Sequence, residues 1–135
     1  MSINYNRNLQ DKNFVSTVTL LAAGANTASF DLEQVEGGDI TNVVFELAGP
    51  ALTTAQLADT KVVTYKLEDS ADGSSFATVD PLIQTTQTGA GGAGAAAKTI
   101  RFRLPANTRR YVRIAQTATA TPGTLTASMV AKLLF

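Results

Sequence analysis

The chain has 135 residues, with 11 basic and 11 acidic side chains and with neither His nor Cys. It therefore lacks the side chain that titrates near neutral pH and the thiolate that attacks substrates or binds soft metals, so ordinary enzyme chemistry is poorly supplied. We expect one domain, large enough to bury a core without disulfides, that is not an enzyme and needs neither a cofactor nor a metal.

Residues 1–11 are polar, and residues 1–14 are predicted to form an N-terminal arm. They lack the basic stretch followed by an apolar run that marks a secretory signal, and no part of the chain has the apolar length of a membrane span. We therefore expect a soluble protein. Because polar termini order only when they are tied down, Asn4, Tyr5 and Arg7 are predicted to contact a partner.

Residues 15–135 are predicted to form a single all-β domain, a two-sheet antiparallel sandwich. Short segments rich in Val, Thr, Phe, Ile and Tyr alternate with clusters of Gly, Asp, Asn and Pro, and no long segment has a helical apolar period. At most one short helical turn is expected, after Pro50. The predicted strands are 15–21, 27–31, 42–47, 62–68, 76–78, 99–104, 111–117 and 125–133.

The middle of the chain predicts a hairpin. Alternating apolar residues in 62–68 are followed by a turn that contains the favourable pair Asp72 and Gly73. Glu68, Asp69 and Asp72 could also be Ca²⁺ ligands, but the regular spacing of a calcium loop and its distal Glu are missing. Turn chemistry is the favoured interpretation.

Residues 89–97 are all Gly or Ala and are predicted to form a flexible loop. Such a segment has almost no side chain to bury, so only contacts from elsewhere would order it. It also lacks the Lys and the Ser or Thr of a phosphate-binding loop.

The charges are strongly segregated along the chain. Residues 1–97 carry four bases and eleven acids, a net charge of −7, while residues 98–135 carry seven bases and no acid. Overall neutrality argues against a nucleic-acid binder, and the segregation points to protein surfaces that meet.

The arginines of the basic part alternate with apolar residues on two predicted strands. If residues 105–109 join these strands in a hairpin, Arg103 faces Tyr111 and Arg101 faces Arg113, which places like charges opposite each other. Acidic side chains must then lie close to these arginines to balance their charge. They could come from this chain or from a neighbouring subunit with complementary charge, and both alternatives stay open. The candidates within the chain are Asp31, Glu33, Glu36 and Asp39.

The segments 101–114 and 121–130 resemble the C-terminal half of small tailed-bacteriophage capsid cement (decoration) proteins, in which a basic "LP…RYVR" strand precedes a Gly-Thr hairpin and an Ala/Thr-rich strand. Residues 8–14 and 69–76 are similar to this family as well. The Gly/Ala loop departs from the family pattern.

The resemblance implies a jelly-roll-like sandwich, usually a homotrimer, on the outer surface of the virion capsid, made in the host cytoplasm. It would bridge major capsid protein subunits and would bind no nucleic acid, membrane or small molecule. The predicted contacts are the N-terminal arm and the arginine-bearing faces of the two predicted strands. A frayed terminus and an ordinary solvated strand face account for the same sequence features equally well. The predicted interface residues are Asn4, Tyr5, Arg7, Arg101, Arg103, Arg109, Arg110, Tyr111 and Arg113.

A second hypothesis is a sandwich module, associated with a tail or head fibre, that binds carbohydrate or a host surface. Sugar sites usually present aromatic platforms. The chain has no Trp, and its only tyrosines are Tyr5, Tyr65 and Tyr111, which weakens this hypothesis.

Overall fold

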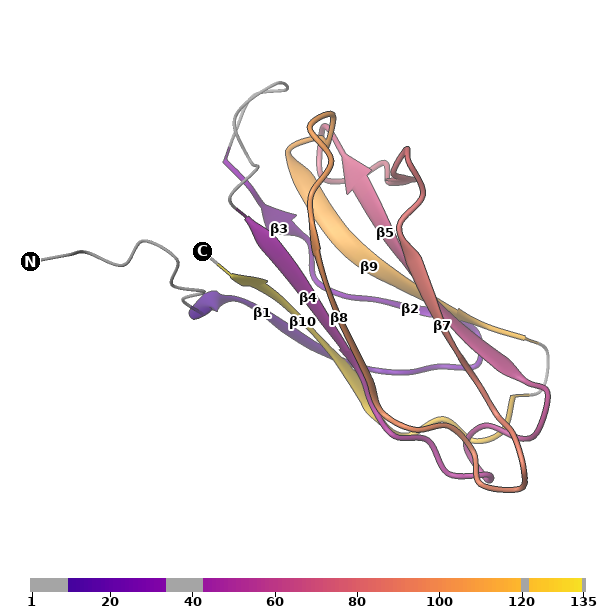
Figure 1. Ribbon diagram of the computed structural model, residues 1–135. Coiled ribbons are helices and arrows are strands. Elements are labelled where there is room, and N and C mark those ends of the chain that lie inside the picture. Colours follow the sequence, from indigo (N-terminus) through magenta and orange to yellow (C-terminus); the bar gives the residue numbers. More distant parts are fainter. Residues whose placement is uncertain (1–9, 34–42, 120–121, 135) are drawn as a thin grey trace, which may run out of the picture.

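The computed structural model describes residues 10–33, 43–119 and 122–134 (Figure 1). Two antiparallel sheets pack face to face, which confirms the predicted all-β sandwich. The described strands of the first half are β1 (Gln10–Thr19), β2 (Ala25–Asn26), β3 (Phe30–Asp31), β4 (Val44–Gly49) and β5 (Val62–Ser70). The second half contributes β6 (Ala77–Thr78), β7 (Gln84–Thr88), β8 (Lys98–Arg103), β9 (Tyr111–Ala118) and β10 (Ser128–Leu134).

The strand order is that of a jelly roll. One sheet has the order β1-β10-β4-β8, and in the other β9 pairs with β2, β3 and β5, while β5 also pairs with β6 and β7. The short strands β2 and β3 add to the same edge of β9, so they act as one interrupted strand. Chain-distant strands therefore become neighbours, as in the double Greek key of jelly rolls.

Alternating side chains build the core between the sheets. In β5, Val63, Tyr65 and Leu67 are buried, while the residues between them are half-buried on the outer face. Phe45 of β4 lies at the centre of an aromatic group, with ring centroids 5.7 Å from Phe30 in the opposite sheet and 5.3 Å from Phe102 on β8. This contact joins the two sheets and anchors β8 to the core.

Strand β7 has no counterpart in the sequence prediction, because its Gln-Thr-Thr-Gln-Thr sequence has no apolar residue. It forms by pairing along β5, and its Gln87 side chain is buried. The Tyr65 hydroxyl donates to Gln87 Oε1 at 2.6 Å, and Gln87 Nε2 donates to the carbonyls of Pro50 and Ala96 at 2.8 Å each. Both polar atoms of the buried Gln87 amide are therefore hydrogen-bonded, and its bonds connect β5 to the loops that contain Pro50 and Ala96.

The predicted pairing of the two arginine strands is wrong. Strand β8 pairs with β4, which places Arg101 beside Glu46, and β9 pairs with β5, which places Arg113 beside Glu68. Residues 104–110 cross from one sheet to the other and do not form a hairpin. Alternation shows only that each strand has one buried face, and two such faces can meet across a core as well as side by side in one sheet.

The short turn predicted after Pro50 is present. The Leu57 N–H donates to the Thr53 carbonyl at 2.8 Å, and buried Leu52 and Leu57 join the core from this connection. Within the described part of the chain, no helix has the length and apolar character needed to cross a membrane.

The Gly/Ala segment lies against the connection between β4 and β5. Leu52 and Ala95 exchange backbone hydrogen bonds of 2.8 and 2.9 Å, and the Gly92 N–H donates to the Asp59 carboxylate at 2.9 Å. The contacts that such a segment needs for order therefore come from the same chain, while its flexibility stays a prediction.

These contacts make two glycines of the loop unequal in a testable way. Both Gly91 and Gly94 have positive φ, but an added Cβ at Gly94 would overlap the Leu52 carbonyl, whereas at Gly91 it would meet nothing within 4 Å. Gly94→Ala is expected to lower the free energy of unfolding by roughly 2 kcal/mol or more, because strain and overlap add. Gly91→Ala carries the conformational strain alone and is the matched control in urea unfolding. Equal losses for both variants would contradict the packed loop.

Candidate protein-interaction surface

The segregated charges of the sequence meet within the folded chain. Each ion pair of the described residues joins an acid from the first 97 residues to a base from the last 38. The jelly-roll order causes this, since it lays β8, β9 and β10 beside strands β3, β4 and β5. The pairs are Arg101 with Glu46 at 2.6 Å, Arg109 with Asp69 at 2.6 Å, Arg110 with Asp31 at 2.7 Å, Arg113 with Glu68 at 2.8 Å, and Lys132 with Glu46 at 3.9 Å.

Of the predicted acidic partners, Asp31 is confirmed as the partner of Arg110. The other partners are Glu46, Glu68 and Asp69 on central strands, which the sequence prediction missed. The position of Glu46 could have been predicted from the sequence. Glu46 lies between the core residues Phe45 and Leu47, so strand alternation directs it outward. An acid at that position favours a basic residue on the neighbouring strand. Residues Glu36 and Asp39 lie outside the described residues.

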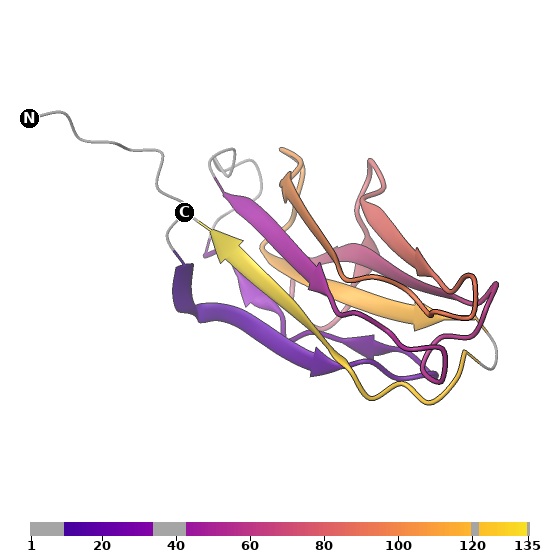
Figure 2. The same cartoon turned by 60° about the horizontal axis from the view of Figure 1, so that its bottom comes forward.

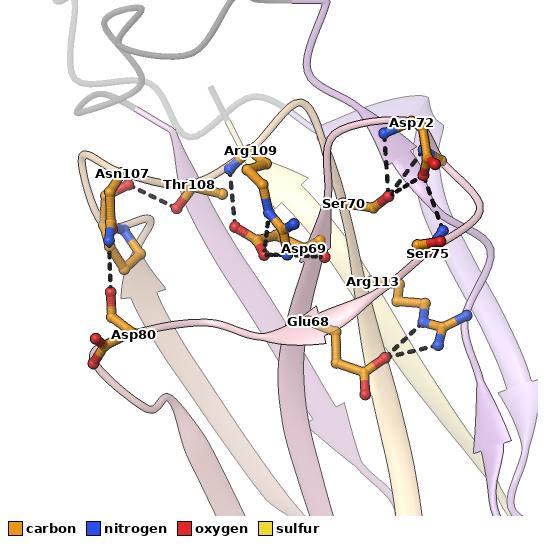
Figure 3. A network of polar contacts seen from close by, with 12 residues as sticks. Glu68, Asp69, Ser70, Asp72, Ser75, Asp80, Asn107, Thr108, Arg109 and Arg113 are labelled. Atoms are coloured by element: carbon orange, nitrogen blue, oxygen red, sulfur yellow. Dashed lines mark hydrogen bonds and ion pairs between the residues drawn. The ribbon is translucent and has the colours of Figure 1, made fainter.

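The ion pair with the most buried acid joins Asp69 at the end of β5 to Arg109 (Figure 3). The Asp69 side chain is only 8% exposed. Its carboxylate accepts the Arg109 backbone N–H at 2.9 Å, Nε at 2.9 Å and Nη2 at 2.6 Å. The loop between β8 and β9 is thereby fixed to the sheet by charge-assisted hydrogen bonds, with Nε and Nη2 both on Oδ1 and the backbone N–H on Oδ2.

Two further arginines are held between an acid and an aromatic ring. The Arg113 guanidinium lies 4.0 Å from the Phe76 ring centre and donates to Glu68 at 2.8 Å. Arg110 lies 5.2 Å from the centre of the Tyr111 ring and donates to both Asp31 oxygens. The Arg110 hydrogen bond, together with a backbone N–H, lowers the pKa of Asp31.

The turn that ends β5 uses its carboxylate for backbone hydrogen bonds. Asp72 Oδ1 accepts the N–H groups of Ser74 and Ser75 at 2.9 Å and the Ser70 hydroxyl at 2.8 Å (Figure 3). The bonds from Ser75 and Ser74 hold the pKa of Asp72 well below its usual range. With β6 pairing back on β5, the predicted hairpin is confirmed.

The three acids of the alternative calcium site are therefore separately engaged: Glu68 with Arg113, Asp69 with Arg109, and Asp72 with its own turn. In the described ranges, no three His, Cys, Asp or Glu side chains come together in a group that could hold a metal ion.

The structure brings some of the predicted interface residues to one end of the sandwich. One row across the first sheet contains Gln10, Leu134, Val44 and Arg103. In the second sheet, Tyr111 at the start of β9 pairs with Ser70 and Asp31. Arg109 and Arg110 come directly before Tyr111, at the end of the loop that joins β8 to β9. We call this region the arginine end; its defining residues are Arg103, Arg109, Arg110 and Tyr111.

The predicted residues on β8 and β9 do not form one surface, because Arg101 and Arg103 share the outward face of the first sheet while Tyr111 and Arg113 share that of the second. Arg101 lies on the outer face of the first sheet and Arg113 on the outer face of the second, so the sandwich separates them. Asn4, Tyr5 and Arg7 lie outside the described residues. The chain enters β1 at Gln10, and the segment that carries these three residues therefore joins the sandwich at the arginine end.

Comparison with known protein families and with curated proteins finds no match to this chain. Of the tyrosines considered as a sugar platform, Tyr65 is buried and Tyr111 is half-buried against Arg110, and Tyr5 lies outside the described residues.

Proposed function

We propose that this protein is a structural virion protein that binds the outer surface of an assembled phage capsid and stabilises the shell. It would act as a homotrimer that bridges major capsid protein subunits, and it would perform no catalysis. The sequence resemblance to capsid cement proteins motivates this proposal. The jelly-roll order of the sandwich is compatible with it.

The observation that supports the proposal most is the composition of the arginine end. Arg109, Arg110 and Tyr111 lie at this end of the second sheet and Arg103 at the same end of the first, where the chain also enters β1 at Gln10. Arginine and tyrosine are enriched at protein interfaces, because both combine a large contact area with hydrogen-bonding groups. The predicted contact of the N-terminal arm with a partner would add to this binding surface.

The ion pairs within the chain change how this surface would bind. Arg109 is held by Asp69 and Arg110 by Asp31, so they are positioned before any partner arrives. A preorganised patch loses less side-chain entropy on docking. Several such contacts, repeated by a trimer on neighbouring capsid subunits, gain affinity through multivalency, and preferential binding to the assembled form stabilises that form.

Sedimentation of the purified protein with expanded capsids of the phage that encodes it tests the proposal. Co-sedimentation at a fixed number of copies per shell is the expected result. A protein that stays in the supernatant at saturating concentration contradicts the proposal. In that case, specific binding to a glycan array would favour the carbohydrate-binding module instead.

A further inference from the structure

The four lateral edges of the sandwich differ in how well they are protected against pairing with another strand. Strand β1 has an irregular register between Gln10 and Val15, and the opposite sheet begins with the two short pieces β2 and β3. At the edge formed by β7, the Lys98 ammonium donates to the Thr86 carbonyl at 3.1 Å. Bulges, short strands and lysine side chains are common devices that blunt a sheet edge.

Strand β8 differs from these edges in its regular pairing, while its own charged side chains, Lys98 among them, oppose pairing with a basic strand. It pairs with β4 without interruption from Lys98 to Arg103, and among the described residues no strand pairs with its other side. Figure 2 shows β8 at the margin of its sheet, next to β4. In an antiparallel strand the hydrogen-bonding groups of alternate residues point away from the neighbouring strand, so β8 presents a row of backbone donors and acceptors.

The side chains of β8 determine which strand could pair with this edge. Lys98, Arg101 and Arg103 are exposed, and the Arg101 side chain is 58% exposed even with its Nε on Glu46. If two copies paired through β8, basic residues would face basic residues, which is destabilising. An extended segment with acidic side chains would instead gain both backbone hydrogen bonds and charge pairing.

We propose that β8 is a docking strand that accepts an extended, acidic segment of a partner protein as an additional antiparallel strand of the sheet. That the partner is the capsid rests on the proposed function. The half-buried Phe102 and Ile100 hold the strand to the core, so the edge is rigid before it binds. The arginine end, where β8 terminates at Arg103, would then be continuous with this edge.

An amide-resolved NMR titration of the full chain with a peptide of alternating Glu and Val, about as long as β8, tests the edge without a capsid. Slower hydrogen exchange at amides of 98–103, with no such protection from a Lys-Val peptide, is the expected result. The double variant Arg101→Gln with Arg103→Gln should bind the peptide at least about tenfold more weakly. Lys61→Gln with Lys66→Gln removes the same charge elsewhere and should leave the affinity unchanged. No protection of β8 at millimolar peptide, or protection of β1 or β7 instead, overturns the inference.

Capsid sedimentation of the same variants separates this inference from the proposed function. If Arg101→Gln with Arg103→Gln weakens capsid binding and Lys61→Gln with Lys66→Gln does not, the result supports docking through β8. Equal binding by both variants would refute the role of β8 in docking and leave the proposed function standing. If the unmodified protein does not bind capsids, the proposed function fails, and the peptide titration still decides whether β8 accepts an acidic strand.

Discussion

Arg109→Ala is expected to lower the free energy of unfolding by about 2–3 kcal/mol, less than the loss of one partner from a fully buried ion pair, because the Arg109 side chain is 35% exposed. The Asp69 carboxylate is 8% exposed, and it would keep only the Arg109 backbone N–H from its present set of bonds to this residue. A buried charge left without its counter-ion is costly, because the carboxylate cannot recover its hydration. Urea unfolding at neutral pH measures the loss.

The adjacent arginine supplies the control for this prediction. Arg110 forms a bidentate ion pair with both Asp31 oxygens, but its side chain is 46% exposed and Asp31 is 35% exposed, against 35% for Arg109 and 8% for Asp69. Water replaces the lost contact in this case, so Arg110→Ala should destabilise the protein far less than Arg109→Ala. Similar losses in the free energy of unfolding for the two variants would contradict the burial of the Asp69 carboxylate.

Phe45→Ala is expected to lower the free energy of unfolding by about 3–5 kcal/mol, because it removes a fully buried aromatic side chain and leaves a cavity. Phe45 contacts Phe30 in the opposite sheet and Phe102 on β8, so its loss weakens the packing of the two sheets as well as the anchoring of the edge strand. Thermal or urea unfolding measures the change.

Phe76→Ala serves as the control for Phe45→Ala, since Phe76 lies outside the core and stacks on Arg113. It should cost clearly less than Phe45→Ala. Hydrogen exchange gives a second readout, in which Phe45→Ala should speed the exchange of β8 amides more than Phe76→Ala does. An unchanged β8 would contradict the role of the aromatic contact in holding that strand.

The fold class could be predicted from the sequence because alternation in strands such as β5 and β9 reports which side chains are buried. Two features could not be predicted in this way. Strand β7 is polar throughout and owes its position to pairing with β5 and to the buried Gln87. The connection 104–110 joins two alternating strands, and alternation is the same whether such a connection turns within a sheet or crosses the core.

The candidate surface was predictable only in its residue types. The sequence indicated that the arginines need acidic partners, and Asp31 was among the acids considered. The partners Glu46, Glu68 and Asp69 depend on strand order, which brings β8 to β4 and β9 to β5 over long sequence separations. No local pattern encodes that order, so the separation of Arg101 and Arg113 onto opposite faces could be found only from the structure.

The heat stability of expanded capsids with and without saturating protein is the most direct test of the proposed function. A stabilising virion protein that binds the assembled shell should raise the temperature at which the shells open, and the rise should grow with the concentration of free protein. An unchanged opening temperature at saturating protein would contradict the proposal, whether the protein binds the shells without stabilising them or does not bind them at all.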